Sequence, residues 1–83
     1  MHTLNFSKKT LRQLNKFDDE LKQRIWDKLK LCKGDPFRFL EHLEQIKGFK
    51  LRVGDYRIII DVDAKNKVLN ILKMGHRKNI YEK

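Results

Sequence analysis

The stretch KGFKLRVGDYRIIIDVDAKNKVLNILKMGHRKNIY, residues 47–81, decides the fold of this chain. Apolar and polar side chains alternate on both sides of Gly54-Asp55, a pattern typical of two strands joined by a two-residue hairpin turn. A third apolar run follows and ends in the basic cluster Gly75-His76-Arg77-Lys78. We therefore expect three strands, over about residues 48–53, 56–63 and 67–74.

The predicted turn fixes which side chains share a face of the sheet. With Gly54-Asp55 as the loop, Arg52 lies opposite Arg57, and Lys50 shares their face. The other face carries the apolar residues Phe49, Leu51, Ile58 and Ile60. Two like charges opposite each other destabilise a hairpin, so the pair indicates an anion held between them. Alternatively, both guanidinium groups turn into solvent or toward the aspartates further along the strand.

The composition favours a polyanionic partner. The 83 residues include 20 Lys and Arg against 11 Asp and Glu, a formal net charge of +9. Such an excess is typical of proteins that bind nucleic acid, although lysine also serves solubility alone. Arginine suits phosphate because its planar guanidinium donates two parallel hydrogen bonds and stays charged at physiological pH. We therefore expect the cationic side of the sheet to bind phosphate groups.

The N-terminal half predicts one strand and two helices. Residues 3–6 alternate as a short strand does, and Ser7 is a favourable N-cap for the first helix. The acidic group at residues 18–20 suits the positive end of a second helix, and Gly34 and Pro36 are stop signals for it. The strand, helices and three later strands together predict an α+β fold.

We expect residues 1–83 to form a single domain, with a two-helix hairpin on one face of a small, mainly antiparallel four-stranded sheet. The other face is then left free for function. Residues 35–47 fit either a helical turn or an apolar-anchored connector. Cys32, the only cysteine, lies on the apolar stripe of the second helix and is expected in the core.

Several classes of function are disfavoured by the sequence. It has no apolar stretch of the ~20 residues that a membrane span needs and no signal-peptide pattern, so we expect a cytoplasmic protein with no membrane partner. His2, His42 and His76 are too scattered to suggest a metal site. There is no phosphate-binding glycine loop or nucleophile elbow either. We expect no metal and no cofactor.

The run K-L-R-V-G-D-Y-R-I-I-I-D-V at residues 50–62, followed by G-H-R-K-N-I-Y at 75–81, resembles the RelE/ParE superfamily of bacterial and archaeal toxins, and its RelE branch most closely. The resemblance implies the toxin of a type II toxin–antitoxin system. It further implies a metal-independent endonuclease that cleaves mRNA in the ribosomal A site, through attack of the ribose 2′-OH on the adjacent phosphate. The partners would be the ribosome, its mRNA and a cognate RelB-like antitoxin.

The same resemblance assigns roles to individual residues. Lys50 matches a strand lysine implicated as the base, and Arg57 an arginine that stabilises the transition-state phosphate. Arg77 matches an acid or charge clamp at the leaving group, His76 an acid–base residue of some relatives, and Tyr81 a tyrosine that stacks on RNA. Further basic residues expected to bind the RNA are Lys47, Arg52, Lys73 and Lys78.

Two other functions remain open at this point. ParE-like relatives share the fold and poison DNA gyrase by binding it, and a non-catalytic RNA-binding module would also carry a basic face. Lys50, Arg57 and Arg77 together favour the nuclease, because a gyrase binder has no need of all three.

Overall fold

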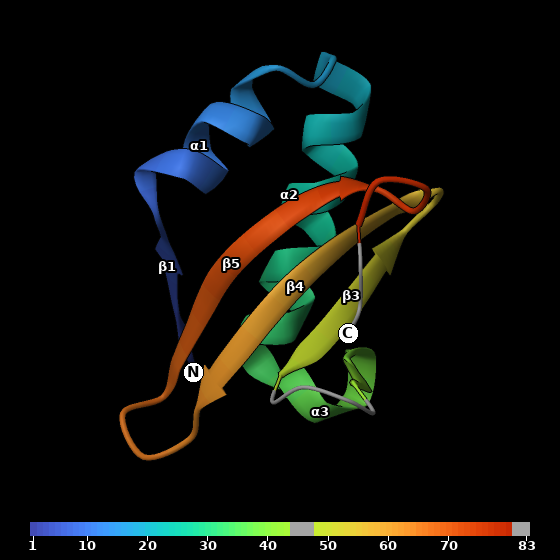
Figure 1. Ribbon diagram of the computed structural model, residues 1–83. Coiled ribbons are helices and arrows are strands. Elements are labelled where there is room, and N and C mark those ends of the chain that lie inside the picture. The colour runs from blue at the N-terminus through green and yellow to red at the C-terminus, as the bar shows by residue number, and fades with distance from the viewer. Residues whose placement is uncertain (44–47, 81–83) are drawn as a thin grey trace.

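The computed structural model describes residues 1–43 and 48–80 (Figure 1). The elements follow one another as β1 (Thr3–Phe6), α1 (Lys8–Asn15), α2 (Asp19–Gly34), α3 (Pro36–Phe39), β2 (Glu41–His42), β3 (Phe49–Val53), β4 (Tyr56–Asp63) and β5 (Val68–His76). The strands form one sheet in the order β1-β5-β4-β3-β2, and α1 and α2 lie on one side of it. The predicted α+β class, with helices over one face, is confirmed.

The sheet has one strand more than predicted within the described residues. Glu41 and His42 pair antiparallel with Lys50 and Phe49 as β2. The remaining neighbours are also antiparallel except β1, which runs parallel to β5. The four-residue α3 likewise adds to the two predicted helices. The prediction of four strands and two helices was wrong here because a two-residue strand and a single helical turn are too short to show periodicity.

The β3–β4 hairpin has the predicted register. Arg52 pairs with Arg57, and Val53 pairs with Tyr56 across the turn. Gly54 has a φ of 59°, whereas the φ of Asp55 is not positive. A positive φ at the first loop residue alone is the pattern of a type II′ turn, whose twist matches that of paired strands. The turn chemistry therefore sets the faces of the sheet.

Strand β5 continues two residues beyond its predicted end and contains a β-bulge. Ile59 pairs with Lys73, but Ile60 pairs with Ile71, so that Leu72 is an extra residue in β5. Beyond the bulge, Gly75 pairs with Arg57 and His76 with Tyr56. Gly75 and His76 thus belong to the strand, and their faces follow from its alternation.

The helices begin where the sequence predicts. The Ser7 hydroxyl accepts a hydrogen bond from the Thr10 amide at 3.1 Å, and the Asp18 carboxylate accepts one from the Leu21 amide at 2.8 Å. Each cap satisfies a donor that the first helical turn leaves unpaired. Within the described ranges, no helix combines the length and the hydropathy that crossing a bilayer requires.

The core lies between the helices and the sheet. It contains Ile25, Leu29 and Cys32 from α2, and Leu51, Val53, Ile58, Ile60, Leu69, Ile71 and Met74 from the strands. Burying one such large side chain contributes roughly 1.5–3 kcal/mol. The core position of Cys32 is confirmed, and burial, which disfavours the charged thiolate, raises the pKa of its thiol to about 11.

Candidate phosphate-binding face

The side of the sheet away from the helices carries a set of basic residues on three adjacent strands. Arg52 lies opposite Arg57, and Lys50 and Lys73 lie on either side of Ile59. We call Lys50, Arg52, Arg57 and Lys73 the cationic face. The shared side predicted for Lys50, Arg52 and Arg57 is confirmed by the register, and Arg57 is partly exposed rather than buried under the helices.

A carboxylate that the sequence analysis missed lies beside two of these cations. Glu41 on β2 approaches the Lys50 ammonium at 3.6 Å and the Arg52 guanidinium at 4.0 Å. Lys50 is the more enclosed of the two, since 20% of its side chain is exposed against 59% for Arg52. Glu41 could not be found from the sequence because its position depends on the pairing of β2. It offsets part of the repulsion between neighbouring cations.

Arg77 is held at the same end of the sheet as the Arg52–Arg57 pair. Its backbone amide donates to the Asp55 carbonyl at 2.8 Å, and its guanidinium Nε lies 3.9 Å from the Asp55 carboxylate. Asp55 belongs to the turn whose flanking residues are Val53 and Tyr56. The structure therefore brings Arg77 to the turn that lies next to Arg52 and Arg57.

His76 lies on the other side of the sheet from Arg57. It pairs with Tyr56, the two rings are 5.4 Å apart, and Tyr56 in turn contacts Phe17 at 5.1 Å between ring centroids. The ring nitrogen Nδ1 accepts from the Lys78 amide at 3.2 Å. The structure does not bring His76 together with Lys50 and Arg57, because β5 continues through residue 76 and its alternation turns this side chain toward the helices.

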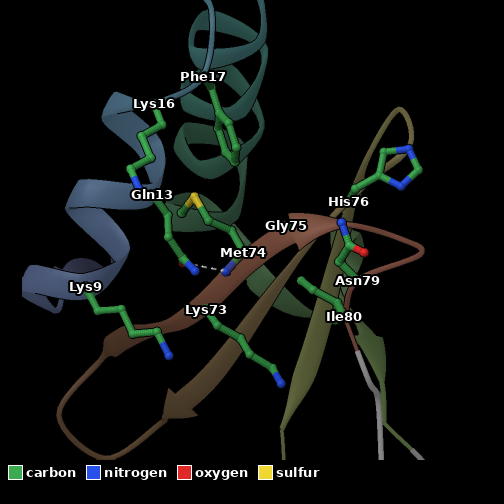
Figure 2. Close-up of a pocket in the computed structure, with 10 residues that line it drawn as sticks. All are labelled: Lys9, Gln13, Lys16, Phe17, Lys73, Met74, Gly75, His76, Asn79 and Ile80. Atoms are coloured by element: carbon green, nitrogen blue, oxygen red, sulfur yellow. Dashed lines mark hydrogen bonds between the residues drawn. The ribbon is translucent and has the colours of Figure 1, made fainter.

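Residues 77–80, which follow β5, turn back over the uncovered side of the sheet. Arg77 to Asn79 form a turn closed by the Asn79 amide on the His76 carbonyl at 2.8 Å, with Lys78 exposed in it. The Ile80 side chain packs against Gly75 of β5, since a Cβ added to Gly75 would lie 3.3 Å from it (Figure 2). Gly75 is the residue that pairs with Arg57 of β4. The predicted RNA contacts Lys47 and Tyr81 lie outside the described residues.

The described side chains do not form a metal centre. Over residues 1–43 and 48–80, no three His, Cys, Asp or Glu residues lie close enough to hold an ion together. What the face offers is fixed positive charge on strands, where positions are held more rigidly than on loops. Such an arrangement can bind a phosphodiester and stabilise added negative charge on it.

Comparison with known proteins places the chain among toxins. Residues 4–81 match the family model of the ParE toxin of the type II toxin–antitoxin system parDE. The RelBE2 toxin–antitoxin complex of Mycobacterium tuberculosis is similar with a TM-score of 0.82 and 23% identity, over 92% of this chain and 98% of that one. The archaeal RelE–RelB complex of Pyrococcus horikoshii gives 0.80 and 24%, over 95% and 98%.

The intact RelBE complex of E. coli is also similar, with a TM-score of 0.79 and 20% identity over 92% of this chain and 96% of that one. Identities this low establish a shared fold. Comparison with curated protein sequences gives no match.

Proposed function

This chain belongs to the ParE toxin family of type II toxin–antitoxin systems, within the RelE/ParE superfamily, and from that premise we propose that it is a ribosome-dependent mRNA endonuclease of the RelE kind. The observation that carries the proposal is the Arg52–Arg57 pair on the uncovered side of the sheet, with Arg77 tied to the adjacent turn. Two arginines opposite each other repel unless an anion lies between them. An RNA phosphodiester is such an anion.

The proposed reaction is an internal phosphoryl transfer. The ribose 2′-OH attacks the adjacent phosphorus, the bond to the 5′-oxygen breaks, and the products are a 2′,3′-cyclic phosphate and a 5′-OH end. Arg57 stabilises the charge that builds up on the phosphorane, which is the largest single contribution expected of a preorganised site. Arg77 stabilises the leaving oxygen by its charge, since a guanidinium does not give up its proton, and water protonates that oxygen.

We assign the base role to Lys50, which accepts the 2′-OH proton when its amine is neutral. Glu41, 3.6 Å from the Lys50 nitrogen, stabilises the ammonium that forms when Lys50 has accepted this proton. Arg52, Lys73, Lys78 and Lys47 would bind neighbouring phosphates, and Tyr81 would stack on a base. His76, on the helix side, would act through its contact with Tyr56 rather than on the reacting atoms.

The proposed setting is the cytoplasm, with the ribosomal A site and its mRNA as partners and a cognate antitoxin as inhibitor. The structures to which this chain is similar include RelE–RelB and RelBE complexes. We expect an inhibitor segment to cover the cationic face or to displace the chain beyond Gly75, because the cationic face and Ile80 both lie on the uncovered side. A complex that inhibits while leaving both exposed would contradict this.

A second candidate function is favoured by the family model itself, which is that of a ParE toxin. A ParE-like protein would bind and poison DNA gyrase without cleaving RNA. The two functions predict different damage after induction: cut messages with intact DNA for the nuclease, or DNA breaks with intact messages for the gyrase poison. Mapping the 5′ ends of cellular mRNA after induction separates them.

The test of the nuclease compares three variants in a translation reaction programmed with one message. Arg57→Ala and Arg77→Ala should each abolish cleavage and relieve growth arrest, while Arg12→Ala, an exposed arginine of α1, should act as the parent does. Circular dichroism checks that the fold is kept. If both site variants remain as toxic and as active as the parent, the proposed mechanism is wrong.

A further inference from the structure

A groove lies between α1 and the free edge of β5. It has a volume of about 420 Å³, within the usual size range of small-molecule and nucleotide sites. Six of its ten lining residues are polar or basic (Figure 2): the full lining is Lys9, Gln13, Lys16, Phe17, Lys73, Met74, Gly75, His76, Asn79 and Ile80. We call it the α1–β5 groove.

The groove exists because β1 stops short of the end of β5. The last pair between these strands joins Phe6 to Ile71, after which the chain turns into α1. The outer edge of β5 beyond that point faces α1 instead of a strand. The Gln13 side-chain oxygen accepts a hydrogen bond from the Met74 amide at 3.2 Å and so satisfies one donor of this edge. The amide nitrogen of Gln13 has two donors that this bond does not use.

The groove lysines differ from Lys50, Arg52 and Arg77 in their charged neighbours. Lys50 and Arg52 lie near Glu41, and Arg77 lies near Asp55. By contrast, the three groove lysines, Lys9, Lys16 and Lys73, form no ion pair within residues 1–43 and 48–80, and no Asp or Glu of these ranges lines the groove. Three uncompensated ammonium groups around a concave surface favour an anionic ligand.

The groove is continuous with the cationic face. Lys73 belongs to both, and Gly75, which lines the groove, pairs directly with Arg57. Paired strands lie ~4.8 Å apart, so a strand of RNA on Arg57 reaches the groove within one nucleotide. Figure 2 shows the Lys9 side chain, from α1, and the Lys73 side chain, from β5, extending in the same direction.

We propose that the α1–β5 groove binds one nucleotide of single-stranded RNA, next to the link that reacts on the cationic face. This inference rests on the proposed nuclease function. Lys9 and Lys73 contact the phosphate of that nucleotide, and Lys16 the backbone beyond it. The side-chain amides of Gln13 and Asn79 donate to or accept from the base, which lies against Phe17 and Ile80.

Binding of a short single-stranded oligonucleotide with 2′-O-methyl sugars tests the groove, because that probe keeps its phosphates and cannot be cleaved. The variant is Lys9→Ala with Lys16→Ala. The matched control is Lys8→Ala with Arg12→Ala, which removes the same charge from exposed positions of α1 that do not line the groove. Lys8, Lys9 and Arg12 lie in α1, where alanine favours the helix, and Lys16 is its C-cap in a right-handed conformation that alanine also adopts, so both variants should fold.

The groove variant should bind about tenfold more weakly, as expected for two lost ammonium–phosphate contacts. Its plot of log affinity against log salt should be shallower by about 1.4, because each phosphate neutralised on a single strand contributes about 0.7. The control should lose less than about twofold. If both variants lose the same affinity for the oligonucleotide, Lys9 and Lys16 act only through the net charge of the protein, and the inference is overturned.

Message cleavage with ribosomes separates this inference from the proposed function. If the parent cleaves and the groove variant matches the control in both cleavage and binding, the groove inference fails and the nuclease stands. If the groove variant binds more weakly than the control variant but the parent cuts no message, the nuclease fails and the groove stands as a nucleic-acid site. A parent that neither binds nor cleaves overturns both.

Discussion

Ile58 and Arg57 are neighbours in β4, yet they belong to two faces of the sheet that are held by different forces. Ile58 is fully buried against α2 and the other strands, where packing alone accounts for its position. Arg57 lies opposite Arg52, an arrangement that burial does not explain and that like charge opposes. The comparison teaches that the covered face specifies the fold, while the cationic face carries a like-charge pair that lowers local stability.

The largest expected effect contrasts two adjacent isoleucines. Ile58 is 0% and Ile59 2% exposed, but only Ile58 belongs to the helix-side core, since Ile59 lies between Lys50 and Lys73. Ile58→Ala should lower the free energy of unfolding by about 3–4 kcal/mol. Ile59→Ala should cost about 2 kcal/mol, because flexible lysine stems can close over the space. Urea denaturation measures both, and a larger loss for Ile59 would break the comparison.

The second prediction concerns the thiol on the covered face. Because burial raises the pKa of Cys32 to about 11, the reactive thiolate is about a hundredfold scarcer near neutral pH than for a thiol with a pKa near 9. Labelling of the native chain by a disulfide reagent should therefore be at least a hundredfold slower than labelling in urea, and should accelerate as the pH rises toward 11. Rapid native labelling at pH 7 would show that α2 does not seal the core.

The third prediction tests the turn that sets the two faces. Gly54→Ala should cost about 1–2 kcal/mol, because alanine is strained at a φ of 59°. Gly54→Asn, which tolerates this conformation, should cost less. A Cβ at this position would also lie 3.2 Å from the Arg24 guanidinium, which can move aside. Thermal melts rank the two variants; equal losses would point to crowding by Arg24 instead of backbone strain.

The smallest effect is expected at Glu41, which lies between Lys50 and Arg52. Glu41→Gln should change stability by less than about 1 kcal/mol, because exposed ion pairs contribute little. It should strengthen RNA binding a few-fold, since the cationic face gains one net charge. Salt titrations of RNA binding provide the measurement. Weaker binding by the variant would mean that Glu41 positions the cations more than it neutralises them.

The sequence predicted most reliably what local chemistry determines. The Gly54-Asp55 turn gave the correct pairing of Arg52 with Arg57, and alternation gave the correct faces. The Ser7 cap was likewise visible, because a capping side chain lies within three residues of the amide it satisfies, and the acidic group at residues 18–20 indicated where α2 begins.

Features that depend on distant segments were missed. The parallel pairing of β1 with β5 and the strand at Glu41 need partners that no local pattern identifies. The bulge at Leu72 and the extension of β5 to His76 carried that histidine to the helix side, away from the cations with which the motif groups it. Lys9 and Lys16 looked like ordinary surface lysines, since only the packing of α1 beside β5 gives them a groove to line.

The pairing of β1 with β5 also bears on when this protein can become toxic during its own synthesis. Asn5 donates to Asn70 across 65 residues of chain, so β1 has no strand to pair with until the ribosome has made β5. Contacts this distant in sequence form late. A nascent chain halted before Val68 should therefore be digested rapidly by a protease, whereas a chain that includes β5 resists, so the host meets a folded toxin only once this strand has been made.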